Sequence, residues 1–166
     1  MGLTYTSPTD LALLDPVELS ERLFATLRNA VPWLVTLSDA DASIPEREGK
    51  WCAKEVIGHL TDSAVNNLSR IVRMQIASEN MPGYAQESWV QIQHYRDREW
   101  AEVLALWFAL NEHIVWTIRN VPPSALPNQA AVAGNPITLG FLIEDYIAHM
   151  QHHLDNLRPR VHPGKA

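Results

Sequence analysis

Two histidines four residues apart lie near the end of the chain, in the segment His149-Met150-Gln151-His152-His153. The segment falls within a helical pattern, and side chains four apart on a helix share a face, with Cβ atoms about 5–6 Å apart. His149 and His153 can therefore direct two imidazoles at one point. A divalent metal such as zinc accepts imidazole nitrogens at about 2.0–2.1 Å. His152 is offset by one residue and is expected to face a neighbour or solvent.

A third imidazole comes from an earlier helical segment that contains His59. His59 shares a helix face with the apolar residues Val56, Leu60 and Ile71, so we expect it to point inward. If the two helices are neighbours, His59, His149 and His153 converge as three neutral ligands and leave a fourth position open for water or substrate. The set contains no carboxylate, which favours zinc or nickel over non-haem iron.

Other polar residues follow the histidines closely. Asp62 and Asp145 lie within a turn of them and could orient their rings as hydrogen-bond acceptors. Ser63, Asn67 and Arg70 continue along the helix of His59 and are candidates for a pocket wall. The Arg70 guanidinium could bind a substrate carboxylate, or it could reach solvent or pair with an acid on a neighbouring helix.

A structural explanation of the same histidines stays open at this point. Histidine pairs at helical spacing also occur by chance on surfaces, and a single inward histidine is usually hydrogen-bonded within the core. Glu55 is assigned to the cap of its helix rather than to the site. Trp51 and Trp89 flank loops and could line a pocket mouth. Cys52 stands at an expected helix N-cap and is not expected to act as a nucleophile.

The elements that must position these residues are helices. The first begins with Asp15 as cap and Pro16 at the first helical position, and Pro32 should kink or split it. Residues 38–50 form a polar loop. Further helices are expected over 53–78, 97–120 and from Thr138 to about Arg158, with Pro159 as the stop and one more short helix within 84–96. Residues 121–137 read as a long loop that could change the order of the helices, and no segment alternates like a strand.

Four long helices in 166 residues predict an all-α four-helix bundle, with residues 1–166 forming a single domain. The net charge of −6 argues against nucleic acid as a partner. No apolar run is long enough to span a membrane. The single cysteine, Cys52, fits a reducing, cytoplasmic compartment.

Two motifs resemble those of a known family. The stretch Gly49-Lys50-Trp51-Cys52-Ala53-Lys54-Glu55 with His59-Leu60 is similar to G-K-W-S-x-K-E-x-x-x-H-L, and Thr138-Leu139 with His149-Met150-Gln151-His152-His153-Leu154 is similar to T-L-x-x-L-L … H-x-x-H-H-L. Both are motifs of the DinB-like, or YfiT-like, metalloenzyme superfamily. Cys52 departs from the usual serine, which should weaken the helix cap.

The resemblance implies a bundle with up-down-down-up topology and a divalent metal, commonly nickel or zinc, held by His59, His149 and His153. It also implies a homodimer. Some members of the superfamily are transferases or isomerases that use a low-molecular-weight thiol.

These observations support three hypotheses about function. The first is a metal-dependent enzyme acting on a small-molecule substrate, either a hydrolase that activates water or a thiol-dependent transferase. The second is a non-catalytic metal-binding or stress-response protein. The third is a structural helical dimer whose histidines bind nothing.

Overall fold

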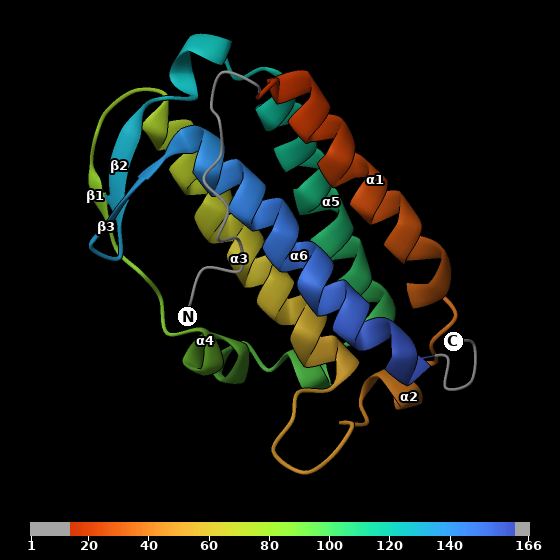
Figure 1. Cartoon of the computed structure of the whole chain (residues 1–166). Coiled ribbons are helices and arrows are strands. Elements are labelled where there is room, and N and C mark those ends of the chain that lie inside the picture. The colour runs from red at the N-terminus through yellow and green to blue at the C-terminus, as the bar shows by residue number, and fades with distance from the viewer. Residues whose placement is uncertain (1–13, 162–166) are drawn as a thin grey trace.

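The computed structural model describes residues 14–161, with side chains as far as Arg158. Within that range four long helices lie side by side (Figure 1): α1 (Pro16–Leu34), α3 (Ala53–Met74), α5 (Trp100–Arg119) and α6 (Leu139–Val161). The predicted four-helix bundle is therefore confirmed. None of the described helices is both long and apolar enough to cross a membrane.

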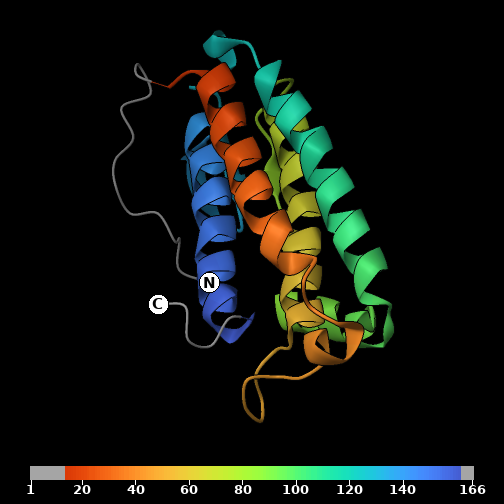
Figure 2. The same cartoon turned by 90° about the vertical axis from the view of Figure 1, so that its right-hand side faces the viewer.

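The direction of the helices gives the up-down-down-up order. α1 and α6 run one way, and α3 and α5 run the other way (Figures 1 and 2). The connection between α3 and α5 carries the chain back to the end where α3 began, so these two helices are parallel. From the sequence, a possible change of this order was attributed to the long loop at residues 121–137. That attribution was wrong, because α5 and α6 are antiparallel across this connection.

The start of α1 follows the predicted cap. Asp15 Oδ1 accepts a hydrogen bond from the Val17 N–H at 3.0 Å, and Pro16 takes the first helical position. One face of the helix then buries Leu19, Leu23, Leu27 and Leu34 in the core. Pro32 does not split the helix, which continues to Leu34. The proline stands close enough to the end that few hydrogen bonds remain to be disrupted.

A small sheet was missed by the sequence analysis. Strands β1 (Asn80–Met81), β2 (Gln129–Val132) and β3 (Asn135–Thr138) form a three-stranded sheet within the described residues, with β1 parallel and β3 antiparallel to β2. The β2–β3 turn places Ala133 and Gly134 at positive φ, the geometry of a tight hairpin. Ala133 is an unusual residue there, and Pro136 lies within β3, so the local sequence does not resemble a hairpin.

Several helix boundaries also differ from prediction. α3 ends at Met74 rather than Ser78, and α5 begins at Trp100 because Tyr95–Asp97 form a separate 3₁₀ turn, η2. A second such turn, η3, spans Pro123–Ala125. The expected short helix within 84–96 is α4 (Gln86–Ile92), and the polar loop contains another, α2 (Asp39–Ala42). The predicted stop at Pro159 was wrong, since α6 continues to Val161. Thr138 is confirmed as a cap, with its Oγ1 accepting from the Phe141 N–H at 3.2 Å.

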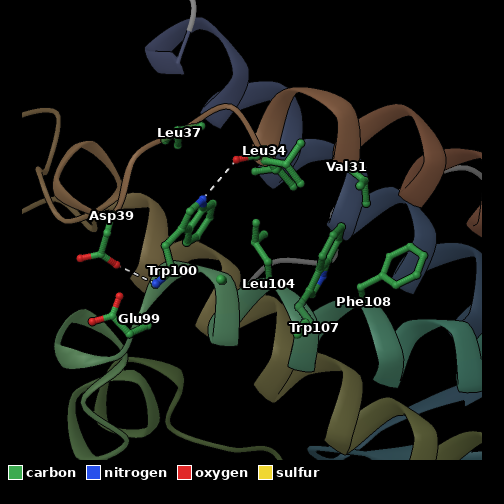
Figure 3. A pocket seen from close by; sticks show the side chains of 12 residues that line it. Val31, Leu34, Leu37, Asp39, Glu99, Trp100, Leu104, Trp107 and Phe108 are labelled. Carbon is green, nitrogen blue, oxygen red and sulfur yellow. Dashed lines mark hydrogen bonds between the residues drawn. The ribbon is translucent and has the colours of Figure 1, made fainter.

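A pocket of about 470 Å³ opens between α1 and α5, and none of its lining residues belongs to α6 (Figure 3). Its lining is mostly apolar and includes Leu34, Leu104, Trp107 and Phe108. None of the predicted site residues lines this pocket.

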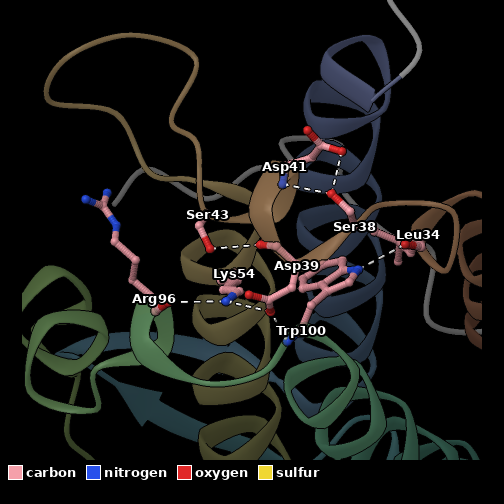
Figure 4. A network of polar contacts seen from close by, with 8 residues as sticks. All are labelled: Leu34, Ser38, Asp39, Asp41, Ser43, Lys54, Arg96 and Trp100. Atoms are coloured by element: carbon pink, nitrogen blue, oxygen red, sulfur yellow. Dashed lines mark hydrogen bonds and ion pairs between the residues drawn. The ribbon is translucent and has the colours of Figure 1, made fainter.

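Polar contacts connect α2 to the N-terminal ends of α3 and α5 (Figure 4). Lys54 is only 3% exposed and its Nζ lies 2.7 Å from Asp39 Oδ1. The same Asp39 oxygen accepts from the Trp100 N–H at 2.7 Å, and the Trp100 indole donates to the Leu34 carbonyl at 3.1 Å. Asp39 therefore neutralises the buried ammonium of Lys54 and satisfies the first N–H of α5. Because Lys54 lies in the first turn of α3, the same contact fixes the start of the helix that carries His59.

Candidate metal centre

Three histidines from two helices meet near one end of the bundle. His59 comes from the second turn of α3, and His149 and His153 come from successive turns of α6. Nε2 of His59 lies 3.3 Å from Nε2 of His149. Each of the three residues offers a ring nitrogen within 4.8 Å of the others. The predicted convergence of these side chains is therefore present in the structure.

These separations suit a shared metal ion. Two nitrogens bonded to zinc at about 2.0–2.1 Å in tetrahedral geometry lie about 3.3–3.4 Å apart. The His59–His149 separation matches this value without adjustment. His153 makes an edge-on ring contact with both partners, at centroid distances of 4.8 Å to His59 and 4.6 Å to His149. The donor set is all imidazole, a ligand type that suits zinc, copper, iron and nickel.

Burial keeps two of the imidazoles neutral. His59 is fully buried and His149 is 8% exposed. Burial, together with the neighbouring histidines, lowers the pKa of His59 to about 3 and that of His149 to about 4. At neutral pH both rings therefore carry a free nitrogen lone pair, which is the form that binds a metal.

Access to the cluster is from the side of His153, the half-buried member. A pocket of about 340 Å³ is lined by His153, Trp51, Gln86 and Asn156, with Lys50 and Glu87 at its rim. The Trp51 ring also packs on His59, with centroids 5.1 Å apart. The prediction that Trp51 lines a pocket is confirmed. Trp89 instead packs on Tyr84, at a centroid distance of 5.0 Å.

The start of α3 positions His59. Cys52 is the N-cap residue, and its N–H donates to Glu55 Oε2 at 2.9 Å. This hydrogen bond confirms the assignment of Glu55 to the helix cap. Glu55 also forms an ion pair with Arg96 at 2.8 Å. Cys52 is buried, and burial raises the pKa of its thiol. A raised pKa disfavours the thiolate, which agrees with the expectation that Cys52 is not a nucleophile.

Asp62 lies one turn beyond His59 and is almost completely buried. Its Oδ1 accepts hydrogen bonds from the Tyr95 hydroxyl, at 2.7 Å, and from the Gln93 amide. Its Oδ2 and Nδ1 of His59 are both buried, and neither has a hydrogen-bond partner among the described residues. Burial raises the pKa of Asp62, against the effect of the two donors. Asp62 Oδ2 and His59 Nδ1 do not bond each other, so the role of Asp62 in orienting His59 stays a prediction.

Asp145 lies one turn before His149 on α6 and is half-buried. This position places it beside the cluster on the opposite helix from Asp62. Its role as an orienting residue stays a prediction.

Ser63, Asn67 and Arg70 form a hydrogen-bonded row along α3 that leads away from the histidines. Asn67 Nδ2 donates to the Ser63 hydroxyl at 3.2 Å, and Arg70 contacts Asn67 Oδ1 at 3.5 Å. Arg70 also donates to the Pro82 carbonyl at 3.0 Å. Within residues 14–158 it has no acidic partner, so the alternative of a pair with a helix acid is not what the structure contains. None of the three lines the pocket beside His153, and their role in a pocket wall stays a prediction.

His152 is not one of the three histidines whose ring nitrogens meet, although its ring contacts that of His153 at a centroid distance of 5.6 Å. It is exposed, and its Nε2 lies 3.0 Å from the Asn156 amide nitrogen.

Sequence analysis did not identify Tyr95 or Gln86. Both come from the connection between α3 and α5, which carries no periodic pattern that would have placed them near His59 or His153. Only the fold brings this segment back across the start of α3 (Figure 1).

Comparison with known proteins identifies the family of this chain. The sequence model of the DinB superfamily matches residues 22–156, most of the chain. The chain belongs to the DinB superfamily. A protein of Oceanobacillus iheyensis named "Putative metal-dependent hydrolase" is 26% identical over 160 residues, covering 90% of this chain and 86% of that protein.

A solved structure has the same fold as the protein described here. YfiT from Bacillus subtilis, described as a probable metal-dependent hydrolase with an unusual four-helix bundle topology, matches with a TM-score of 0.76. The match covers 96% of each chain at 20% identity. It supports the order of the helices seen here.

Proposed function

We propose that this protein is a metal-dependent hydrolase in which His59, His149 and His153 hold a divalent ion, zinc or nickel. The observation that carries the proposal is the 3.3 Å separation of the His59 and His149 Nε2 atoms in a buried cluster that His153 completes. Two superfamily relatives with names that include metal-dependent hydrolase support the same reaction class.

The residues around the cluster have separate tasks in this proposal. Asp62 would accept a hydrogen bond from the Nδ1–H group of His59 with its free oxygen, which would present Nε2 to the ion. Trp51 packs on His59 and keeps water from one side of it. His153 faces the pocket, so a substrate enters past this residue. When bound, the ion would lower the pKa of a water molecule and provide a nucleophile at neutral pH.

Metal analysis of histidine variants tests the assignment. Protein purified without a histidine tag should contain about one divalent ion per chain. His153→Ala should lose most of it, because two imidazoles hold an ion weakly, whereas His152→Ala should retain it. Hydrolysis of activated esters and amides should follow metal content. Equal metal loss in the two variants would contradict the ligand assignment.

Thiol transfer is the competing reaction. Cys52 is the only cysteine in the sequence and is buried at the cap of α3, so a thiolate ligand would have to come from outside the chain. Cobalt-substituted protein tests this directly. A change in its visible spectrum on titration with a low-molecular-weight thiol, combined with no hydrolysis, would favour transfer over hydrolysis.

A further inference from the structure

The pocket beside His153 has opposite charges at its rim. Lys50 comes from the loop before α3 and Glu87 from α4, and both side chains are exposed. Within residues 14–158 neither has an ion-pair partner, so they do not neutralise each other. Unpaired charges of both signs around one pocket are complementary to a ligand that also carries both signs.

Another residue of the pocket lining, Gln86, has an unused acceptor. Gln86 Oε1 is buried and finds no hydrogen-bond partner in the part of the chain that the structure describes, and Gln86 lines the same pocket as Glu87. A buried oxygen without a donor costs free energy, and a ligand N–H recovers it once the half-buried Gln86 side chain turns this oxygen toward the pocket. Gln86 directly precedes Glu87 in α4, and an amide oxygen accepts from an ammonium or amide N–H and not from an anion.

From these contacts we infer that the pocket binds a zwitterionic ligand of the dipeptide class. This inference rests on the proposed hydrolase function and names its substrate. The ammonium group of the dipeptide lies against Glu87 and Gln86, its carboxylate lies near Lys50, and its peptide bond faces His153. Hydrolysis then consumes one water, breaks the C–N bond, and yields a carboxylate and an amine that takes up the released proton.

The size of the pocket sets the length of the ligand. A volume of about 340 Å³ is near the lower limit for small-molecule sites. A dipeptide fills such a space, and the Trp51 ring provides an apolar wall for one of its side chains. Longer peptides would have to extend past the charged rim, where the terminal carboxylate could no longer reach Lys50.

Calorimetric titration on metal-stripped protein tests the charge recognition without turnover. The ligands are alanyl-alanine, its N-acetyl derivative and its C-terminal amide. Alanyl-alanine should bind most tightly. Lys50→Met should weaken alanyl-alanine about three- to fivefold, as expected for exposed charge pairs, and should leave the amide unchanged. Glu87→Gln should weaken alanyl-alanine by a similar factor and leave the N-acetyl derivative unchanged.

Two matched control residues lie in the loop that carries Lys50. Arg47 and Glu48 are exposed and do not line the pocket, so Arg47→Met and Glu48→Gln should leave all three affinities unchanged. The inference is overturned if the blocked ligands bind as tightly as alanyl-alanine. It is also overturned if each rim variant weakens all three ligands equally, because that would reflect net charge rather than recognition of one end.

A second measurement separates this inference from the proposed function. Metal-loaded protein is assayed for release of free alanine from alanyl-alanine and for hydrolysis of an uncharged ester. Ester hydrolysis without alanine release would overturn the dipeptide inference and leave the hydrolase intact. A chain that binds no metal but still distinguishes the three ligands would contradict the hydrolase and retain the recognition.

Discussion

The ring of Tyr95 lies directly on the backbone of Gly58. A Cβ atom built at Gly58 would stand 2.2 Å from Tyr95 Cδ2 and 2.3 Å from Cγ, far inside contact distance. The glycine therefore allows the ring to approach α3 closely enough for its hydroxyl to reach Asp62. This contact immediately precedes His59, so the packing that requires glycine and the candidate metal centre share one turn of helix.

Gly58→Ala should destabilise the protein by about 1–3 kcal/mol through overpacking. This loss should exceed the gain of about 1 kcal/mol that alanine brings to a helix interior. Chemical denaturation of the two proteins measures the difference. The control is the same substitution in a Tyr95→Ala background, where the space is vacant. Gly58→Ala should then be neutral or stabilising, and an equal loss in both backgrounds would show that the ring is not the cause.

Metal removal should lower stability only when the cluster is intact. An ion that binds only the folded state adds about 2.7 kcal/mol to the free energy of unfolding at a hundredfold excess over its Kd. A chelator should therefore lower the melting temperature of the wild type and leave that of His59→Ala unchanged. Superimposable melting curves for the wild type with and without chelator would contradict metal binding.

Acid should destabilise the metal-free protein through its buried histidines. The pKa of His59 is lowered to about 3 and that of His149 to about 4, against 6.5 for free histidine. Between these values the unfolded chain binds more protons than the folded one, so stability falls as the pH drops below 6.5. Each histidine contributes a slope of up to about 1.4 kcal/mol per pH unit.

Denaturation of metal-free protein at pH 7 and pH 5 measures this slope. His59→Gln removes one of the two groups and should reduce the loss between these values. The prediction fails if the variant and the wild type lose the same free energy of unfolding.

Asp62→Asn should lower metal affinity without lowering stability. Burial raises the pKa of Asp62, so its charge is unfavourable at neutral pH and a neutral amide should leave stability unchanged or higher. An amide is a weaker acceptor for the His59 N–H, and we expect metal affinity to fall about 10- to 100-fold. Melting curves and competition with a chelator measure the two effects. Unaltered metal affinity would show that Asp62 serves only Tyr95 and Gln93.

The helices of the bundle could be predicted from sequence because their apolar residues recur at helical spacing. Leu19, Leu23 and Leu27 identify α1, and the cap at Asp15 fixes where it begins. The pair His149 and His153 follows from the same periodicity, since both lie on one face of α6. Their convergence with His59 could be predicted only on the further assumption that α3 and α6 are neighbours. The order of the helices came from the resemblance to a family.

The connections could not be predicted in the same way. The β2–β3 hairpin turns through Ala133 rather than asparagine and contains Pro136, so neither its turn nor its strands carry the usual residues. Gln86 and Tyr95 reach the candidate site from a segment whose position depends on tertiary packing. The direction of the Arg70 side chain was likewise open, because its acceptor, the Pro82 carbonyl, belongs to that segment.

The 3.3 Å contact between His59 and His149 closes a stretch of 90 residues. His149 and His153 can come together in an isolated helix, whereas His59 joins them only after the intervening chain has been ordered, at an entropic cost that grows with loop length. Contacts of this range slow folding and form late. Refolding followed by the colour of bound cobalt should therefore lag behind the recovery of helical circular dichroism, and would time the docking of α6 onto α3.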